Sequence, residues 1–467
     1  MREWEPVVGL EIHVQLKTQT KMFCRCPNTF ATEPNTQTCP VCLAFPGALP
    51  TPNETAIEWA IKLGLALGCE IAPRALFHRK HYPYPDLPKG YQISQYDEPL
   101  CINGSFVVPG EDDEFEVGIV RAHLEEDAAK TIHVGGATGR IVGAAHSNVD
   151  FNRGGTPLVE IVTRPDIRSA DQARRFLQLL RQTIVELGIS DAEMEKGQLR
   201  VDANVSVREV GEPGFRTRSE LKNMNSFNHI GRGIDAEVRR QIGLWEGGGE
   251  VVQQTLDYEV KSDTVTPRRR KEEADDYRYF PEPDLVPVEP PAELLERLQL
   301  ELRDLPGARI HSLAQHVAFD AALDLVATGN ERKARLLVEH GLDWPTAANV
   351  AMNQLAAIEP LPENAAALVT IIEQRDAIPR EQLTASFAES ATKLIDVDAV
   401  LSEKVVADTS ELEPLVERIL ADNPGQVAAY KAGKQGLLGY FVGQVMKETQ
   451  GKADPKVVNE LLRTKLG

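Results

Sequence analysis

Gly9-Leu10-Glu11-Ile12-His13-Val14-Gln15-Leu16 alternates strictly between apolar and polar residues. Because successive side chains of a strand point to opposite faces, this pattern predicts a half-buried β-strand. Glu11 and His13 then point the same way, roughly 6.5 Å apart. A carboxylate and an imidazole so placed can share a metal ion or hold a charged ligand. The same alternation is typical of the wet face of an antiparallel sheet, so the stretch alone leaves both interpretations open.

A second acidic stretch favours a cation site. His123-Leu124-Glu125-Glu126-Asp127 carries three adjacent acids and is followed by Lys130. Adjacent carboxylates repel one another unless a cation or a basic substrate neutralises them. Together the two stretches supply hard oxygen ligands, which suit Mg²⁺ and its bound phosphates.

The length and composition indicate a globular protein of several domains. A chain of 467 residues is too long for one hydrophobic core, so we expect two to four domains. The sequence has no run of about 18 apolar residues, which argues against a membrane-spanning helix. Its first residues lack the basic and apolar regions of a secretory signal. We therefore expect a cytoplasmic protein without membrane contact.

The charge distribution bears on nucleic-acid binding. A net charge of −19 argues against a general nucleic-acid binder, because attraction to phosphates needs basic surface. Two local segments have the opposite sign: residues 425–467 carry seven basic and three acidic residues, and Pro267–Lys271 is a short basic island. Either segment can contact RNA or can be an ordinary solvated surface.

Residues 1–291 are rich in short alternating segments, turns and glycines. We expect an α+β cradle domain with a mixed, largely antiparallel sheet. One helix is predicted after Ser169, with an apolar stripe along one side and Gly188 just past its end. The proline-rich stretch 281–291 predicts a stiff connector.

Beyond residue 291 the composition changes to Ala, Leu and Glu with helical periodicity. We expect an all-α domain over 292–407, broken at Pro306, Pro345, Pro360–Pro362 and Pro379. A small helical tail domain follows over 408–467. There we expect one helix over Gly439–Lys447, a stop at Gly451 and a last helix after Pro455.

Four of the six cysteines form two close pairs, Cys24-x-Cys26 and Cys39-x-x-Cys42. Two such pairs, twelve residues apart, can fold together into a tetrahedral Cys₄ zinc knuckle, and in a reducing compartment a metal is favoured over a disulfide. With all four positions filled by protein, the zinc is structural. Four free thiols are the alternative. Cys69 and Cys101 are predicted to be small core residues.

Three further stretches carry more polar groups than packing requires: His78–Gln92, Asp150–Glu160 and Leu199–Arg208. The first concentrates cations on a proline-held loop that suits phosphate, and the second pairs a Gly-Gly turn with acids. The third points Arg200, Asp202, Asn204, Ser206 and Arg208 to one face. Each alone is also typical of a turn or a solvated strand, but together they indicate one site.

Several common catalytic motifs are missing from the sequence. It has no phosphate-binding loop ending in Gly-Lys-Ser/Thr, no dinucleotide-binding Gly-x-Gly-x-x-Gly and no Gly-x-Ser-x-Gly elbow. Gly135–Gly139 is glycine-rich but lacks the required Lys, so we interpret it as a hairpin turn. No activated nucleophile is evident.

In combination these stretches resemble the B subunits of the tRNA-dependent aspartyl/glutamyl-tRNA amidotransferases. The resemblance runs in family order along the first 290 residues, and the C-terminal part also looks like the family's helical region and tail. The stretches that carry it are Gly9–Leu16, His78–Asp97, His123–Lys130, Asp150–Thr163, Met194–Arg208, Glu220–Phe227, Asp276–Asp284, Gly443–Lys447 and Gly451–Pro455.

The resemblance implies a reaction and the residues for it. ATP phosphorylates the side-chain carboxylate of Glu or Asp wrongly esterified to tRNA, and ammonia converts the acyl phosphate to the amide. The expected Mg²⁺ ligands are Glu11, His13, Glu125, Glu126 and Asp150. The expected catalytic residues are Glu11, His13, Glu125, Lys80 and His81. Substrate or ATP contacts are expected at Lys89, Arg153, Asp202, Asn204 and Arg278, with Lys80, His81 and Lys89 also candidates for the ammonia path.

It also implies a fold and partners. The first domain is expected to be similar to the glutamine synthetase and guanidino kinase fold. The family forms a heterotrimer that acts on misacylated tRNA, so an amidase-type glutaminase (the A subunit) and a small C subunit are expected partners. An aminoacyl-tRNA synthetase is a further possible partner. The tail is expected to contact the tRNA elbow, recognising shape.

Two positions depart from the family pattern. Leu256 stands where an Arg commonly follows the Thr of Gln254-Thr255, which puts a substrate contact there in doubt. Ala129 stands where Gly is usual, a change we expect a helix or strand to tolerate.

Two rival functions remain open. A zinc-containing RNA-binding scaffold would not turn over ATP. A self-contained ligase using free ammonia would act without partners.

Overall fold

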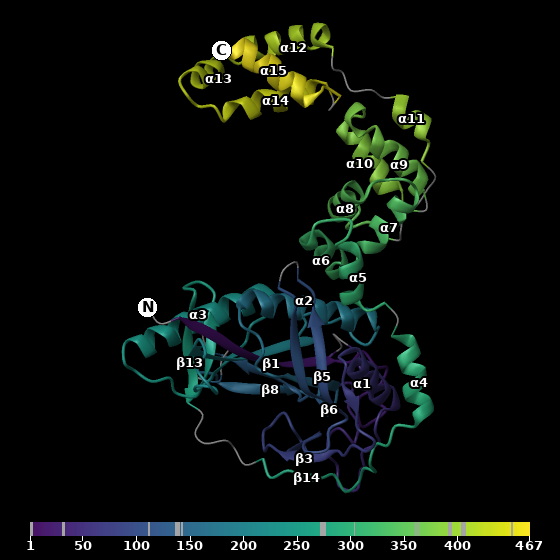
Figure 1. The fold of residues 1–467 in the computed structure, drawn as a ribbon, viewed down its shortest axis with the longest axis vertical. Coiled ribbons are helices and arrows are strands. Elements are labelled where there is room, and N and C mark those ends of the chain that lie inside the picture. Colours follow the sequence, from purple (N-terminus) through teal and green to yellow (C-terminus); the bar gives the residue numbers. More distant parts are fainter. Residues whose placement is uncertain are drawn as a thin grey trace. The chain divides into compact units, whose positions relative to one another are not determined.

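The computed structural model describes residues 3–29, 33–110, 113–135, 141, 143–270, 277–302, 304–359, 362, 364–390, 395–402, 408–449 and 452–467. The chain divides into two compact units, Met1–His311 and Ser312–Gly467 (Figure 1). Along the part of the chain so described, no helix combines the length and the apolar run needed to cross a bilayer.

The first unit contains all the described strands. They are β1 (Trp4–Gln15), β2 (Glu70–Ile71), β3 (His78–His81), β4 (Tyr91–Ser94), β5 (Cys101–Val108), β6 (Phe115–Glu126), β7 (Lys130–Val134), β8 (His146–Asp150), β9 (Pro157–Thr163), β10 (Leu199–Glu209), β11 (Ser219–Lys222), β12 (Gln254–Glu259), β13 (Thr264–Arg270) and β14 (Phe280–Pro281).

Nine of these strands form one sheet, in the order β13-β12-β11-β10-β1-β9-β6-β5-β2. Only the β11–β12 pair is parallel, and every other neighbouring pair is antiparallel. The predicted mixed, largely antiparallel sheet is confirmed. A small sheet has the order β14-β3-β4, and β7 and β8 form a separate hairpin.

The alternation in the opening stretch is confirmed in β1. Leu10, Ile12 and Val14 are buried, whereas Glu11 and His13 are partly exposed on the opposite face. β10 alternates in the same way over most of its length, although Ser206, predicted on its polar face, is buried and donates to the Val7 carbonyl. The large sheet therefore has one apolar face and one polar face.

Four helices of the first unit are α1 (Glu54–Ala66), α2 (Ala170–Glu186), α3 (Phe227–Glu246) and α4 (Ala292–Glu301). In Figure 1, α2 and α3 cover one face of the large sheet, and the small sheet with β3 and β14 lies on the other side. Phe176 of α2 packs edge-on against Phe106 of β5, with ring centroids 5.7 Å apart. The helices therefore bury the apolar face and leave the polar face to the site.

The helix predicted after Ser169 is confirmed. Ser169 caps α2 by accepting from the Gln172 amide, and Gly188 follows the helix end with φ +74°. Helices α1 and α3 were not predicted. The inward stripe of α3 contains the polar residues Glu237 and Gln241, which are paired by a 2.6 Å hydrogen bond, so the apolar periodicity is interrupted.

The proline-rich stretch 281–291 is not a free connector. Glu282 is buried and accepts two hydrogen bonds of 2.7 Å from Arg79, and Val288 forms a β-bridge with Ala75. The chain then enters α4, which packs against α1. Arg297 donates to Glu58 there. These contacts attach the stretch to the first unit, where β14 pairs with β3.

Two glycine-rich or basic stretches lie partly outside the described residues. Of the predicted hairpin turn Gly135–Gly139, residues 136–139 fall outside; the flanking strands β7 and β8 do pair antiparallel. Of the basic island Pro267–Lys271, the backbone of 267–270 belongs to β13, and Lys271 falls outside.

The second unit is helical, as predicted. Helix α5 (Pro306–Leu313) spans the boundary between the units. It is followed by α6 (Phe319–Ala327), α7 (Glu331–Glu339), α8 (Trp344–Asn353), α9 (Ala365–Glu373), a short 3₁₀ turn (Arg375–Ala377), α10 (Arg380–Glu389), α11 (Val397–Ser402), α12 (Thr409–Asp422), α13 (Pro424–Lys431), α14 (Leu437–Glu448) and α15 (Pro455–Leu466).

The predicted helix boundaries hold where they are described. Pro306 begins α5, Pro345 lies in the first turn of α8, Pro379 directly precedes α10, and α15 begins at Pro455 with Asp454 as its cap. Pro362 lies between α8 and α9, whereas Pro360 and Gly451 fall outside the described residues. In the tail, α12, α14 and α15 share one apolar core that includes Val416, Phe441 and Leu462.

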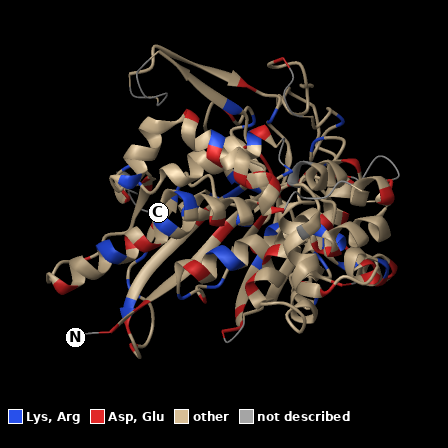
Figure 2. Cartoon of the chain, turned by 90° about the horizontal axis from the view of Figure 1, so that it is seen from above, with Lys and Arg blue, Asp and Glu red and all other residues tan. Residues whose placement is uncertain are grey.

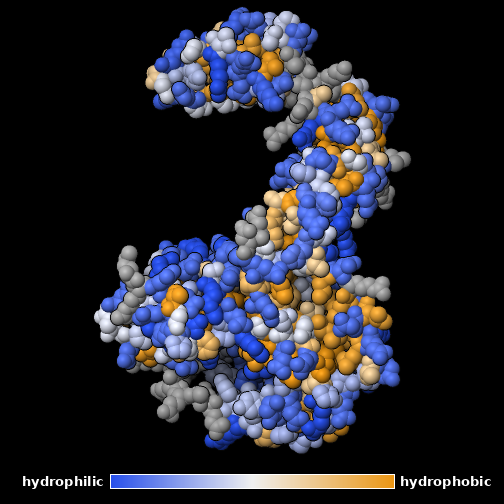
Figure 3. Space-filling model, viewed as in Figure 1, coloured by the Kyte–Doolittle hydropathy of each residue, from blue (hydrophilic) through white to orange (hydrophobic). Residues whose placement is uncertain are grey.

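Charged residues are mixed along the elements (Figure 2), whereas apolar surface is concentrated on one side of the first unit (Figure 3). Acidic and basic residues are interspersed along the helices and strands (Figure 2). Apolar side chains gather on the side of the first unit where α1 and α4 lie (Figure 3), and Leu300 of α4 is among the exposed ones.

Replacing either of two helical glycines by alanine should change the free energy of unfolding, in opposite directions. A Cβ at Gly64 in α1 would lie 2.4 Å from the buried Cys101 Sγ, whereas one at Gly243 in α3 meets no atom within 4 Å. Gly64→Ala should therefore lower the free energy of unfolding by about 1–3 kcal/mol through overpacking. Gly243→Ala should raise it by up to about 1 kcal/mol through helix propensity. Urea unfolding of both variants measures this, and a Gly64→Ala variant as stable as the parent would contradict the packing described.

Candidate functional site

The polar face of the large sheet brings together charged residues from four neighbouring strands. Residues directly opposite each other in antiparallel strands share a face. In that register Glu11 of β1 is opposite Asp202 of β10, and His13 is opposite both Arg200 of β10 and Glu160 of β9.

Glu160 of β9 lies between β1, which carries Glu11 and His13, and β6, which ends in the second acidic stretch. On its other side it lies opposite His123 of β6, and Glu125 follows two residues later on the same face. The Glu160 carboxylate is 3.6 Å from His13 Nε2 and 3.6 Å from His123 Nε2. His13 Nε2 is also 3.7 Å from Glu125 and 3.9 Å from Glu11. We call Glu11, His13, His123, Glu125 and Glu160 the carboxylate–histidine cluster.

Burial and crowding shift the pKa values in this cluster. Burial raises the pKa of Glu125 to about 7, with Glu160 adding to the rise. Burial, aided by Glu160, also raises the pKa of Glu11. For Glu160 burial acts in the same direction, but His123 and His13 outweigh it and hold its pKa well below the usual range.

The two histidines differ. Burial lowers the pKa of His123 to about 4, so this imidazole is neutral. Burial alone would lower the pKa of His13, but contact with Glu160 and the charge of Glu125 outweigh it and raise the value. The cluster thus crowds three carboxylates around a single readily protonated imidazole.

This donor set fits a cation. One donor atom each from Glu11, His13 and Glu160 lie within 4.8 Å of one another, and so do donor atoms of His123, Glu125 and Glu160. An octahedral Mg²⁺ with bonds of about 2.1 Å has neighbouring ligands about 3 Å apart and opposite ligands about 4.2 Å apart. The separations of 3.6 to 3.9 Å in the cluster lie between these two values, so the side chains would shift slightly to hold the ion.

Two lysines border the cluster. Burial alone would lower the pKa of Lys80 on β3, but the charges of Glu125, Tyr279 and Glu160 outweigh it and raise the value. β3 pairs with β4, and Ser94 of β4 donates to Glu125 at 3.4 Å, so Lys80 borders the cluster. On the other side Lys222 of β11 pairs with Asp202, and with Glu220 at 3.0 Å. The site therefore offers carboxylates in the centre and ammonium groups at its edges.

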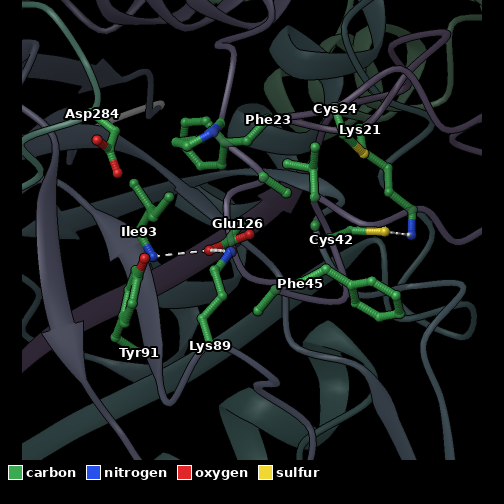
Figure 4. A pocket seen from close by; sticks show the side chains of 15 residues that line it. Lys21, Phe23, Cys24, Cys42, Phe45, Lys89, Tyr91, Ile93, Glu126 and Asp284 are labelled. Atoms are coloured by element: carbon green, nitrogen blue, oxygen red, sulfur yellow. Dashed lines mark hydrogen bonds and ion pairs between the residues drawn. The ribbon is translucent and has the colours of Figure 1, made fainter.

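Glu126, predicted as a further Mg²⁺ ligand, points elsewhere. Its carboxylate accepts from the Ile93 amide at 3.0 Å and pairs with Lys89 (Figure 4). Both residues line a cavity of about 220 Å³ whose opposite wall includes Lys21, Cys24 and Cys42. Of the two consecutive glutamates, Glu125 therefore belongs to the cluster and Glu126 lines the cavity.

Of the four clustered cysteines, Cys24 and Cys42 line this cavity. The sulfur atoms of all four lie within 4.8 Å of one another, with Cys42 Sγ 3.9 Å from Cys39 Sγ and 4.0 Å from Cys26 Sγ. A tetrahedral zinc with Zn–S bonds of about 2.3 Å requires S–S separations of about 3.8 Å. A hydrogen bond from Cys24 lowers the pKa of Cys42 to about 5. The cluster can hold a metal, as the spacing predicted.

Cys69 and Cys101 are buried, as predicted. Burial raises the pKa of Cys69 to about 12 and that of Cys101 well above its ordinary value, so both thiols stay protonated.

The remaining predicted residues are spread around the cluster. Asp150 lies on the β7–β8 hairpin opposite Lys130 and accepts from the Asn35 amide, so the structure does not bring it to Glu11 and Glu125. Arg153 donates to the carbonyls of Ala128 and Ala129.

Three more predicted residues lie at the edges of the site. Asn204 lines a small polar cavity of about 100 Å³ together with Glu11, Arg218, Glu220, Gln253 and Gln254. His81 contacts the Arg278 carbonyl at 3.1 Å and packs against Phe280. Arg278 is exposed, with φ +45°.

Two cations of the stretch His78–Gln92, which was predicted to bind phosphate, are paired with carboxylates. Arg79 is neutralised by Glu282 and Asp284, and Lys89 by Glu126. The stretch is the hairpin of β3 and β4, and Lys80 is the cation in it that faces the carboxylates.

Four residues of the site were not predicted from the sequence: Glu160, His123, Glu220 and Lys222. A signal for Glu160 exists, because it is the lone charge in the otherwise apolar and buried strand Pro157–Thr163. A carboxylate in such a strand needs a partner. Lys222 and Glu220 could not be placed from the sequence, because their position depends on the pairing of β10 with β11.

The two departures from the family pattern have clear surroundings. Ala129 lies in the loop between β6 and β7, not on a helix or strand as expected, but its φ is not positive, so an alanine causes no backbone strain there. Leu256 is buried in β12 and pairs with Leu221, which points it away from the polar face.

Comparison with known proteins gives the family. Residues 6–296 match the GatB/GatE catalytic domain, and residues 337–466 match the GatB domain. The chain is 44% identical over 480 residues to the B subunit of the aspartyl/glutamyl-tRNA(Asn/Gln) amidotransferase of Syntrophotalea carbinolica, covering 99% of this chain and 98% of that protein. The proteins of the same name from Persephonella marina (44% over 485 residues; 99% of each) and Frankia casuarinae (45% over 499 residues; 100% and 96%) are similarly close.

The first match spans the whole polar face with its carboxylate–histidine cluster and the four cysteines, and the second spans most of the helical unit. The relatives are matched over 96–99% of their length. This chain belongs to the GatB family of amidotransferase B subunits.

Proposed function

We propose that this chain activates and amidates misacylated tRNA. In the proposed reaction a side-chain carboxylate oxygen of Glu-tRNA(Gln) or Asp-tRNA(Asn) attacks the γ-phosphorus of ATP, and ADP leaves. Ammonia then attacks the acyl carbon, phosphate leaves, and the nitrogen loses a proton to give Gln-tRNA(Gln) or Asn-tRNA(Asn). The name of the relatives, which specifies these tRNAs, supports the substrate assignment.

The observation that carries the proposal is the carboxylate–histidine cluster. Three carboxylates lie within 3.6 to 3.9 Å of one imidazole nitrogen on a rigid sheet. Phosphoryl transfer needs mainly positioning and neutralisation of charge, which such a cluster provides once it holds a cation.

We assign Mg²⁺ to Glu11, Glu125 and Glu160, with His13 at the centre. When bound, the ion supplies positive charge to the phosphate oxygens of ATP. Glu160 replaces Glu126 and Asp150 of the sequence-based assignment, because it shares the face that those two do not. Lys80 stands beside the same carboxylates and is proposed to contact the transferred phosphoryl group.

The remaining substrate contacts are proposed by position. Asp202 lies opposite Glu11, and Asn204 lines a small cavity with Glu11. Arg153, His81 and Arg278 are proposed as further substrate contacts. Lys89 and Glu126 line the cavity beside the cysteine cluster, where we propose that ammonia passes. The similarity of the first unit to the glutamine synthetase and guanidino kinase fold stays a prediction.

Ammonia is proposed to come from partner chains, an amidase-type A subunit together with a small C subunit, and an aminoacyl-tRNA synthetase is a further candidate partner. The protein's cysteines support this division of labour. Four belong to the metal cluster, and Cys69 and Cys101 are buried and protonated, so they are unsuited to attack glutamine. We expect the assembly in the cytoplasm.

The helical part is proposed to position the tRNA. The domain boundaries at 291 and 407 stay predictions, and the tail 408–467 has its own apolar core. Lys431, Lys434 and Lys447 are exposed on it, and we propose that they contact phosphates.

The cysteine cluster is proposed to hold a structural Zn²⁺. Its sulfur separations suit a tetrahedral ion, and four protein ligands leave no open position for a substrate.

Glu125→Gln tests the catalytic proposal. The substitution keeps the shape and removes a charge that the cation needs, so ATP-dependent amidation should fall by orders of magnitude while tRNA binding is kept. The assay supplies misacylated tRNA and ammonium chloride to the complex with its partners and follows release of phosphate.

Glu116→Gln is the matched control, because Glu116 lies on the same strand but is exposed. It should leave amidation unchanged. Near-normal amidation by Glu125→Gln, or equal losses in both variants, would show that the site is misplaced. Absence of any ATP turnover in the parent would favour the non-catalytic RNA-binding scaffold.

Cys42→Ser tests the zinc proposal. Loss of one thiolate should lower the zinc content of gently purified protein well below one ion per chain and lower the midpoint of thermal unfolding. Cys69→Ser, which changes a cysteine outside the cluster, should keep the zinc. Zinc-free parent protein with four freely reacting thiols would contradict the assignment.

Replacing Lys431, Lys434 and Lys447 by Gln tests the tail. Each lost phosphate contact should flatten the slope of log K against log salt for tRNA binding by roughly 0.7–0.9. The same change at three exposed lysines of the first unit, Lys17, Lys196 and Lys261, controls for net charge. If both triple variants bind tRNA like the parent with the same slope, the tail does not contact phosphates.

A further inference from the structure

A continuous row of aromatic rings lies at the edge of the site, beside Lys80. Tyr84 stacks on Tyr82 with ring centroids 5.3 Å apart, and Tyr82 is followed by Tyr277 at 6.5 Å. Tyr277 is 6.2 Å from Tyr279, which stacks on Tyr96 at 4.2 Å. We call Tyr84, Tyr82, Tyr277, Tyr279 and Tyr96 the tyrosine row.

The row is assembled from three separate segments of chain. Tyr82 and Tyr84 belong to the loop after β3, Tyr96 follows β4, and Tyr277 and Tyr279 precede β14. All three segments belong to the small sheet on the polar side of the large one. The fixed pairing of that sheet therefore determines the order of the rings.

Core packing does not account for these rings. Tyr82, Tyr84 and Tyr96 expose 38%, 51% and 54% of their surface. Pro83 and Pro85 flank Tyr84 and restrict its backbone, and the Tyr84 amide donates to the Tyr82 carbonyl. Large aromatic rings held rigidly in solvent are typical of binding surfaces.

The middle of the row lies beside a lysine of the site. Lys80 Nζ lies 4.9 Å from the centroid of the Tyr277 ring. Lys80 belongs to β3, which pairs with β4, and Ser94 of β4 donates to Glu125 at 3.4 Å. Both ends of the row are exposed, so a strand that follows the rings passes Lys80 at the edge of the cluster.

We propose that the tyrosine row stacks the unpaired bases at the 3′ end of the tRNA and so leads the esterified amino acid to the carboxylates. This inference rests on the proposed function and deepens it by assigning the binding site of the acceptor end. Bases stack on aromatic side chains irrespective of sequence, which suits an end that all tRNAs share.

The extent of the row favours a nucleic-acid strand over the adenine of ATP. A single base covers one or two rings, whereas five rings follow one another here, and the rings at both ends are exposed. The negative backbone would pass Lys80 beside the middle of the row.

The test compares two forms of one uncharged tRNA, intact and with its unpaired 3′ nucleotides removed. The full-length chain should bind the intact form more tightly. Tyr84→Ala should weaken binding of intact tRNA by about 5- to 150-fold, the cost of one lost stacking contact. It should leave binding of trimmed tRNA unchanged.

Tyr84→Phe keeps the ring and should restore the preference for intact tRNA. Phe215→Ala removes an exposed ring of the first unit outside the row and should change neither affinity. Equal affinities of the parent and Tyr84→Ala for intact tRNA would overturn the inference. So would an unchanged tRNA affinity together with a raised KM for ATP, since the row would then stack adenine.

The proposed function is tested separately in the same preparations, by ammonium-dependent amidation of misacylated tRNA in the complex. Amidation by the parent together with equal tRNA affinities in Tyr84→Ala rejects only the stacking role. No amidation by the parent rejects the proposed function itself.

Discussion

Glu160 lies opposite a histidine on each side in the middle of the large sheet, 3.6 Å from His13 and 3.6 Å from His123. Its burial would be costly without these partners, because an isolated buried carboxylate loses its hydration. The hydrogen bond with His13, the histidine whose pKa is raised, helps to keep it ionised. Burial, aided by that negative charge, raises the pKa values of Glu125 and Glu11 on either side. The whole face is thus arranged around one buried charge that attracts cations.

The sheet is a suitable scaffold for this arrangement because its register is fixed by the buried face. A slip of one residue in β1 would bury Glu11 and His13 and expose Ile12, so the apolar packing under α2 and α3 holds the polar face in place. The residues that meet are far apart in the chain, from Glu11 to Lys222. Stability on one face therefore sets the geometry on the other.

Much of this could be predicted from the sequence where local patterns decide the outcome. The alternation of Gly9–Leu16 predicted β1 and the shared face of Glu11 and His13, and the cysteine spacing predicted a compact cluster. The cap at Ser169 and the glycine at 188 bounded α2 correctly. In these cases the signal lies within one strand, helix or loop.

The rest depends on pairing between distant strands. Glu125 and Glu126 look equivalent in the sequence, yet neighbouring residues of a strand point apart, and only Glu125 reaches the cluster. Glu160 is the one charged residue of an otherwise mostly apolar strand, and its partners on the two neighbouring strands follow only from the pairing. The prolines of the stretch 281–291 predict a linker, but Glu282 accepts a hydrogen bond from Arg79, some 200 positions earlier in the chain. This bond holds the stretch against the first unit.

The central claim is that the carboxylate–histidine cluster is a cation site centred on Glu160. Mn²⁺ suits the same oxygen ligands as Mg²⁺ and is visible by electron paramagnetic resonance. Titration of the full-length chain with Mn²⁺, compared with Glu160→Gln, tests the claim most directly. The account predicts saturable binding that Mg²⁺ displaces and that Glu160→Gln weakens by at least tenfold. Equal Mn²⁺ binding by the parent and Glu160→Gln would contradict it.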